Sequence, residues 1–175
     1  NLYNVTDAAA FKGTTNINGG TVNVKDTLTQ MTLDLKGGTL NLGRNANVGN
    51  FSITEGAKLS LSIPDGTFEN YENEINTLTT GFYSGILSDL TVDYDATAAA
   101  GSNMDKITLN GAGSGSATVG SSIKLTSVNV IKDGDTMNNG IFLTGTPAAS
   151  LDNIEDVTET ITSTTTSGGF KYTFT

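Results

Sequence analysis

The chain has 175 residues, 36% hydrophobic and 15% charged, which allows a buried core and excludes a highly charged disordered chain. Its net charge of −9 repels phosphate, so we expect neither nucleic acid nor an anionic membrane surface as a partner. Cysteine and histidine are absent, which excludes disulfides, imidazole metal sites and histidine-dependent serine catalysis. No apolar run reaches the ~18 residues of a membrane span, so we expect no membrane contact within this chain.

Residues 1–62 contain an internal repeat. Gly20, Gly38 and Gly56 are spaced 18 residues apart, within the phrases "NINGGTVNV", "DLKGGTLNLG" and "SITEGAKLSLS". Alternating apolar residues follow each glycine, with the last pair shifted by one position: Val22 and Val24, Leu40 and Leu42, Leu59 and Leu61. This alternation is typical of a strand with one buried face, and glycine allows the positive φ of a sharp corner.

A hairpin explains one such phrase but not an 18-residue recurrence that keeps the inward positions in phase. The repeat therefore predicts an all-β fold, a parallel β-helix or β-solenoid in which equivalent residues stack on successive coils. A β-sandwich or meander is the alternative. We expect the core of the coil to hold Leu33, Leu35, Leu40 and Leu42. The outward polar ladder would consist of Thr21, Asn23, Thr39 and Asn41.

The repeat becomes irregular after residue 62. Residues 63–85 begin with a Pro-Asp-Gly turn and continue as an acidic, aromatic-bearing stretch, which predicts an irregular excursion. The alternating pattern returns at residue 86, so residues 86–175 are predicted to form further β rungs and cap-like strands at the C-terminal end. No strong linker divides the chain. We therefore expect residues 1–175 to form a single elongated domain.

Three aspartates on predicted strands are candidates for a carbohydrate site. Asp34 occupies an outward position of a regular rung, and Asp93 and Asp95 flank Tyr94 on one strand face. Glycoside hydrolysis requires two carboxyl groups at a defined separation, but solvated outward carboxylates explain the same pattern. A lyase would also need a well-placed basic residue, and the single arginine, Arg44, lies in a predicted turn.

Calcium is the metal that the sequence comes nearest to supporting. The stretch "KDGDTMNNG" (132–140) places Asp133 and Asp135 two residues apart in a turn. Asn138 and Thr144 stand where an EF-hand loop needs glycine and glutamate. An ordinary Asp-Gly turn explains the stretch better, and we expect no metal and no cofactor.

Several phrases resemble the passenger regions of bacterial autotransporter adhesins. They are "GGTLNLG", "LTVDYDATAAAGSNMDKITLNGAGSG" and "SSIKLTSVNVIKDGD", and the resemblance covers residues 15–62 and 86–134. The resemblance implies a right-handed parallel β-helix, secretion, and a place on the bacterial cell surface, anchored to the outer membrane through a part outside this sequence. It also implies adhesion to host surfaces or matrix, or cell–cell self-association. It transfers no binding residues.

The sequence therefore favours an extracellular adhesive segment without enzymatic activity. Its partner would be a host surface protein, a glycan or another copy of the chain. A polysaccharide-binding or polysaccharide-cleaving β-helix is the first alternative, and the outer domain of a bacterial filament protein such as flagellin is the second.

Overall fold

The structure is a computed structural model that describes residues 13–110, 118, 120–134 and 138–145, and the strands within 154–155, 163–167 and 170–174. The described residues form strands and connecting segments and contain no helix. The strands are β1 (Thr14–Ile17), β2 (Thr21–Val24), β3 (Leu28–Leu35), β4 (Thr39–Leu42), β5 (Ala46–Ile53), β6 (Lys58–Ser60), β7 (Thr77–Asp95), β8 (Lys106–Leu109), β9 (Ser121–Lys132), β10 (Leu143–Gly145), β11 (Ile154–Glu155), β12 (Ser163–Ser167) and β13 (Phe170–Phe174).

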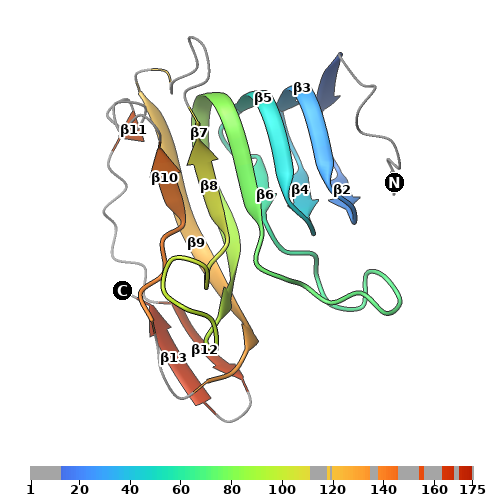
Figure 1. Cartoon of the computed structure of the whole chain (residues 1–175). Helices are drawn as coiled ribbons and strands as arrows, with labels where there is room; N and C mark the ends of the chain where they lie inside the picture. Colours follow the sequence, from blue (N-terminus) through green and yellow to red (C-terminus); the bar gives the residue numbers. More distant parts are fainter. Residues whose placement is uncertain are drawn as a thin grey trace.

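The chain winds in coils, with each strand pairing in parallel with the equivalent strand one coil away (Figure 1). We call the stack of β1, β3, β5, the first part of β7, β8 and β10 the first wall. The second wall stacks β2, β4, β6, the second part of β7, β9 and β11. This parallel, solenoid-like arrangement confirms the predicted all-β coil. The β12–β13 pair is an antiparallel hairpin outside the coil.

The predicted glycine corners are confirmed. Gly20, Gly38 and Gly56 have φ values of 77°, 78° and 89°, which residues with a Cβ atom rarely adopt. The first two coils are offset by 18 residues, as in the pairing of Leu28 with Ala46. At the third coil Leu40 pairs with Leu59, which confirms the one-residue shift read from the sequence.

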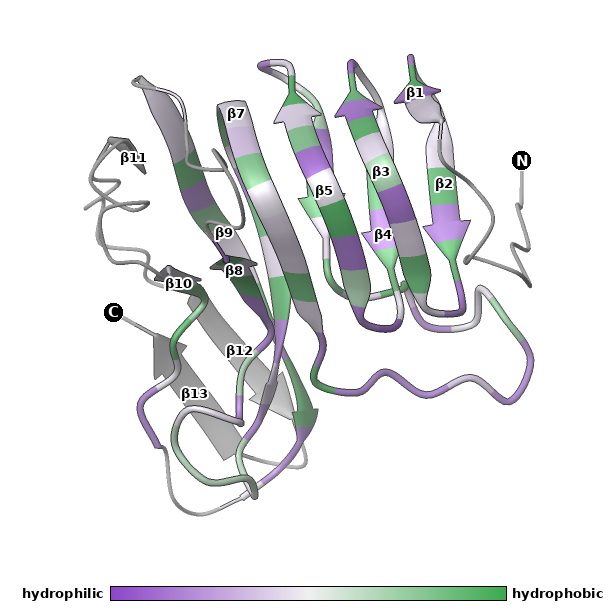
Figure 2. Cartoon of the chain, turned by 45° about the horizontal axis from the view of Figure 1, so that its top comes forward, coloured by the Kyte–Doolittle hydropathy of each residue, from purple (hydrophilic) through white to green (hydrophobic). Residues whose placement is uncertain are grey.

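The core of the coil is apolar and tightly packed. The four leucines predicted to be inward, Leu33, Leu35, Leu40 and Leu42, are each at most 1% exposed. Phe51 and Tyr83, neighbours on the first wall, pack with ring centroids 5.9 Å apart. Hydrophobic and hydrophilic bands alternate along β3 and β5 (Figure 2), because successive side chains of a strand point to opposite faces.

A long insertion interrupts the coil between β6 and β7. Ala46 pairs with Leu78, an offset of 32 residues, so this coil contains 14 more residues than the 18-residue repeat (32 − 18 = 14). The extra chain runs through residues 61–76, which we call the arch; it forms a long loop between β6 and the start of β7 in Figure 1. The sequence predicted an excursion over 63–85, but the structure ends it at Asn76, where the 19-residue strand β7 follows.

Candidate functional site: a polar groove beneath the arch

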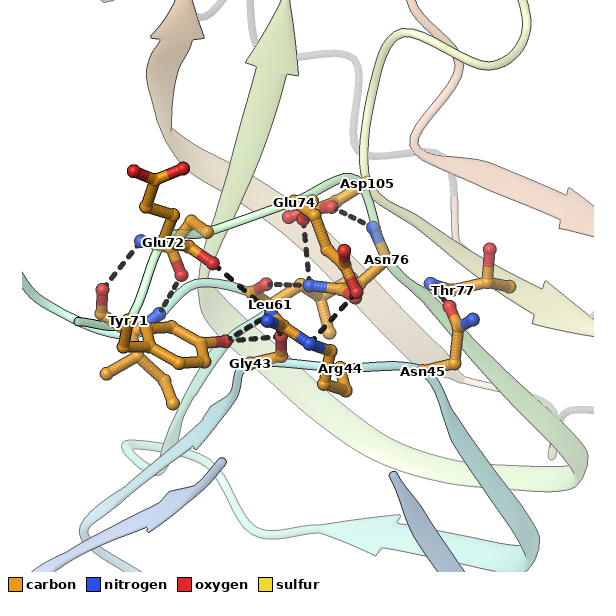
Figure 3. A network of polar contacts seen from close by, with 12 residues as sticks. Gly43, Arg44, Asn45, Leu61, Tyr71, Glu72, Glu74, Asn76, Thr77 and Asp105 are labelled. Atoms are coloured by element: carbon orange, nitrogen blue, oxygen red, sulfur yellow. Dashed lines mark hydrogen bonds and ion pairs between the residues drawn. The ribbon is translucent and has the colours of Figure 1, made fainter. Parts of the chain in front are cut away.

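The arch is fastened to the coil by Arg44, the residue after the corner Gly43 (Figure 3). Its Nε lies 3.0 Å from Glu74 Oε1, and its Nη1 donates to Tyr71 Oη at 2.8 Å and to the Glu72 carbonyl at 3.3 Å. The guanidinium also stacks on the Tyr71 ring, 4.6 Å from the centroid. The turn arginine that the sequence showed as solitary is therefore the anchor of the insertion.

Asparagine side chains close the base of the arch. Asn73 accepts from the Ile63 amide at 3.0 Å and donates to the Ile63 carbonyl at 2.8 Å. Asn76 donates to the Leu61 carbonyl at 3.3 Å, and its own amide donates to Asp105 Oδ1 at 2.5 Å (Figure 3). The two ends of the arch are thus tied to each other and to the chain that follows β7.

A groove of about 1000 Å³ lies between the arch and the outward face of the second wall. This is the upper end of the volumes that small-molecule sites usually have. Its uncharged polar lining consists of hydroxyl and amide side chains: Thr39, Asn41, Ser60, Ser62, Tyr71, Asn73, Thr91, Ser127 and Asn129. Such side chains both donate and accept hydrogen bonds, as do the hydroxyl groups of a polar ligand.

The charged lining of the groove is mainly acidic. Four carboxylates, Asp65, Glu72, Asp89 and Asp93, face two ammonium groups, Lys58 and Lys132. Lys58 pairs with Asp89 at 2.7 Å, and Lys132 pairs with Asp95 at 3.2 Å. Both lysine charges are therefore neutralised, and the remaining carboxylates give the groove a negative potential.

The predicted outward ladder of Thr21, Asn23, Thr39 and Asn41 is partly covered in the structure. The register pairs Thr21 with Thr39 and Asn23 with Asn41, and Asn41 Nδ2 donates to Asn23 Oδ1 at 2.6 Å. The side chains point outward, as expected, but Asn41 is only 3% exposed. Thr39 and Asn41 line the groove, so these two members of the ladder lie under the arch.

Asp34 is separated from the other two aspartates. It lies on the first wall, paired with Ser52, whose hydroxyl donates to Asp34 Oδ1 at 2.5 Å. The groove is built on the second wall and does not include Asp34. The carbohydrate candidates predicted from the sequence therefore do not form one site.

Asp95 is occupied by structural contacts. Its Oδ1 accepts from the Thr97 amide at 2.8 Å and from the Thr97 hydroxyl at 2.5 Å, and its Oδ2 pairs with Lys132. Burial opposes ionisation, but these Thr97 and Lys132 contacts hold the pKa of Asp95 below its usual value. Asp95 fixes the turn after β7 rather than presenting a free carboxylate.

Asp93 lies on the floor of the groove and is 0% exposed, contrary to the solvated carboxylate that the sequence also allowed. Asn129 Nδ2 donates to its Oδ1 at 3.2 Å. The Ser62 hydroxyl lies beside the carboxylate and favours its charged form, while Oδ2 has no hydrogen-bond partner among the described residues. Burial raises the pKa of Asp93 to about 6, with Asp65 adding to the rise and Ser62 and Asn129 opposing it.

Asp105 is a second buried carboxyl group, which the sequence did not single out. It is 0% exposed, and it accepts from the amides of Asn76 and Asp93 at 2.5 and 2.7 Å. Burial, followed by the nearby charge of Asp93, raises the pKa of Asp105 to about 9 against these two hydrogen bonds. Only the phrase "DKITL" marked its position, and that phrase gave no sign of burial.

Among the described residues, no group of three acidic side chains is placed to hold a metal ion. Asp133 is half-buried, while Asp135 lies outside the described residues, so the predicted turn at 132–140 is described only in part. The helix-free described chain also offers no helix long and apolar enough to span a membrane.

Comparison with protein-family models, curated proteins and solved structures found no match.

Replacing Arg44 with alanine is expected to loosen the arch while leaving the coil folded. Arg44 supplies the ion pair, the hydrogen bonds and the stacking contact that hold Tyr71 and Glu74, and lysine cannot reproduce this planar geometry. Hydrogen exchange should be about tenfold or more faster at amides within residues 64–75, but unchanged in β3 and β5. Lys36→Ala, at an exposed corner, is the control. Unchanged exchange in the arch would show that Arg44 is not its anchor.

Proposed function

We propose that the chain is an adhesive segment of a secreted bacterial surface protein, and that the groove beneath the arch binds a glycan. The observation that carries this proposal is the groove itself, which has a volume of about 1000 Å³ and is lined by hydroxyl, amide and carboxylate groups. A row of such groups matches the alternating donors and acceptors along a sugar chain. The parallel, solenoid-like coil supports the finer proposal of a right-handed parallel β-helix of the autotransporter-passenger type.

The charge distribution supports the same choice of partner. The chain carries a net charge of −9, and both lysines of the groove are paired with aspartates. Anionic polymers are therefore disfavoured, which leaves neutral or cationic glycans on a host surface or in a matrix. The stacked coils would hold the groove away from the cell, where weak contacts on many copies add up.

A polysaccharide-cleaving enzyme is the second candidate, and Asp93 is the observation that favours it. Glycosidases use one carboxylic acid with a raised pKa and a second carboxylate. Asp93 has a raised pKa, and the charge of Asp65, across the groove on the arch, contributes to it. Release of new reducing ends from a bound polysaccharide, abolished by Asp93→Asn, would establish this candidate in place of the binding module.

The glycan-binding proposal predicts that blocking the groove abolishes binding. Ser127→Trp places a large ring on the half-buried outward face of β9, within the groove. Ser84→Trp makes the same change at a half-buried outward position of the first wall and is the matched control. On an array of neutral, amino and acidic glycans, Ser127→Trp should lose at least about tenfold in affinity, while Ser84→Trp binds like the unmodified chain.

Two outcomes would contradict the proposal. The first is that no glycan class binds the unmodified chain. The second is that both tryptophan variants weaken binding to the same degree, since that would place the contact outside the groove.

A further inference from the structure

The floor of the groove contains an acceptor that lacks a donor. Asp93 is fully buried, and its Oδ1 receives the Asn129 amide while Oδ2 receives nothing from the described residues. A buried carboxylate oxygen without a hydrogen bond is costly, because it has lost water and gained no replacement. Such an atom on the lining of a groove is a position at which a bound ligand can supply the donor.

The surroundings of Asp93 restrict what that donor can be. Ser62 and Asn129 flank the carboxylate. With the Asn129 amide nitrogen directed at Asp93 Oδ1, its oxygen remains an acceptor. Asp93 Oδ2 is thus a charged acceptor on the lining of the groove that has no hydrogen-bond partner among the described residues. A primary ammonium group has three N–H donors and no acceptor, and it is small enough to reach a confined position.

Charge favours the same group. Asp93 forms no ion pair among the described residues, whereas the two groove lysines are already paired. A cation arriving at Asp93 would gain a charge-assisted hydrogen bond in a site of low dielectric constant. Asp65 and Glu72, which line the groove from the arch, would attract it over a longer range.

We infer that the groove selects a glycan bearing primary amino groups, a polymer of unacetylated amino sugar, and that Asp93 is the residue that recognises the ammonium group. This inference rests on the proposed glycan-binding function and specifies its ligand class. An N-acetyl group in the same place would offer one N–H donor and bring a carbonyl oxygen and a methyl group toward the Asp93 carboxylate. A hydroxyl group would offer one donor without charge.

The test compares three oligomers of the same length and linkage: a β-1,4-linked glucosamine oligomer, its fully N-acetylated form and the corresponding glucose oligomer. Titration calorimetry on the full chain at about pH 7, where the Asp93 carboxylate is charged, measures each affinity. We expect the glucosamine oligomer to bind at least about tenfold more tightly than either of the others. Asp93→Asn should remove that preference.

Asp34→Asn is the matched control. Asp34 is an outward, half-buried aspartate on the first wall with a hydroxyl donor, so its replacement removes the same formal charge from the chain. Binding of the glucosamine oligomer should stay unchanged in this variant. Equal losses for Asp34→Asn and Asp93→Asn would overturn the inference, since they would show general attraction to an acidic protein.

The remaining outcomes separate this inference from the proposed function. Equal affinity for all three oligomers, lost in Ser127→Trp, would overturn the ammonium selection and leave glycan binding intact. If none of the three binds, and no glycan on the array does, both proposals fail. Lysine side chains present the same ammonium group, so an oligolysine that binds more tightly than the glucosamine oligomer would also overturn the inference.

Discussion

Replacement of Gly85 with alanine is expected to lower the free energy of unfolding by more than about 3 kcal/mol. Gly85 pairs with Ile53 where β7 crosses from one wall to the other, and its φ is 115°. A Cβ atom there would lie 1.8 Å from the Ile53 carbonyl oxygen. The oxygen is a backbone atom, and the position of a Cβ atom is fixed by the backbone that carries it, so no side-chain movement relieves the contact. Urea-induced unfolding followed by circular dichroism measures the loss.

Gly56→Ala separates the two causes of that loss. Gly56 also has positive φ, at 89°, but a Cβ atom there would meet nothing within 4 Å. This control should lose only the roughly 1 to 2 kcal/mol that the left-handed conformation costs a residue with a side chain. If Gly85→Ala were no more destabilising than Gly56→Ala, that result would contradict the close stacking of coils at Gly85.

The regular coils could be predicted because their sequence signal is local and repeated. Gly20 and Gly38 each mark a corner, and Leu40 and Leu42 alternate with polar residues immediately afterwards. The first half of β7 lacked this signal. Leu78 and Thr80 are buried, but the next buried position is Tyr83 rather than residue 82. The alternation slips by one at this point, as it also does in β3 and β5. Without a glycine corner at the 18-residue spacing to mark the coil, a strict period of two misses this strand.

The groove could not be predicted, because it depends on contacts between distant parts of the chain. Arg44 and Glu74 are 30 residues apart in sequence, and their ion pair holds the arch over the second wall. The pattern of β7 correctly placed Asp93 on the outward face. An outward side chain is solvated only where nothing covers the wall, and the arch covers the wall at Asp93. The burial of Asp93, its raised pKa and the inferred ligand class all follow from the position of the arch over the second wall.

The stability of the folded chain is expected to fall as pH rises from about 6 to about 9. Asp105 has an unfolded-state pKa near 3.8 and a folded-state pKa raised to about 9, so between these values the folded state holds a proton that the unfolded state has released. The free energy of unfolding therefore decreases with pH, with a limiting slope of about 1.4 kcal/mol per pH unit. Chemical denaturation at a series of pH values measures this slope.

Other aspartates act in separate pH ranges. Asp93, with its folded-state pKa of about 6, adds to the slope only below about pH 6. Asp89 has a lowered pKa: burial opposes ionisation, but hydrogen bonds from Lys58 and Thr126 outweigh it. Asp95 also has a lowered pKa. These two stabilise the fold above their unfolded-state pKa and lose that contribution as the pH falls below it. The interval from about 6 to 9 therefore isolates Asp105.

Asp105→Asn should flatten the slope in that interval, because the asparagine side chain does not titrate. The slope, rather than the absolute stability of the variant, is the quantity to compare. The asparagine amide nitrogen would face one of the two backbone N–H groups whose hydrogen bonds Asp105 accepts, and this lowers stability at every pH. Asp26→Asn, at an exposed position, should keep the slope of the unmodified chain. A slope that persists in Asp105→Asn would assign the pH dependence to another group. A flat profile in the unmodified chain would contradict the raised pKa of Asp105.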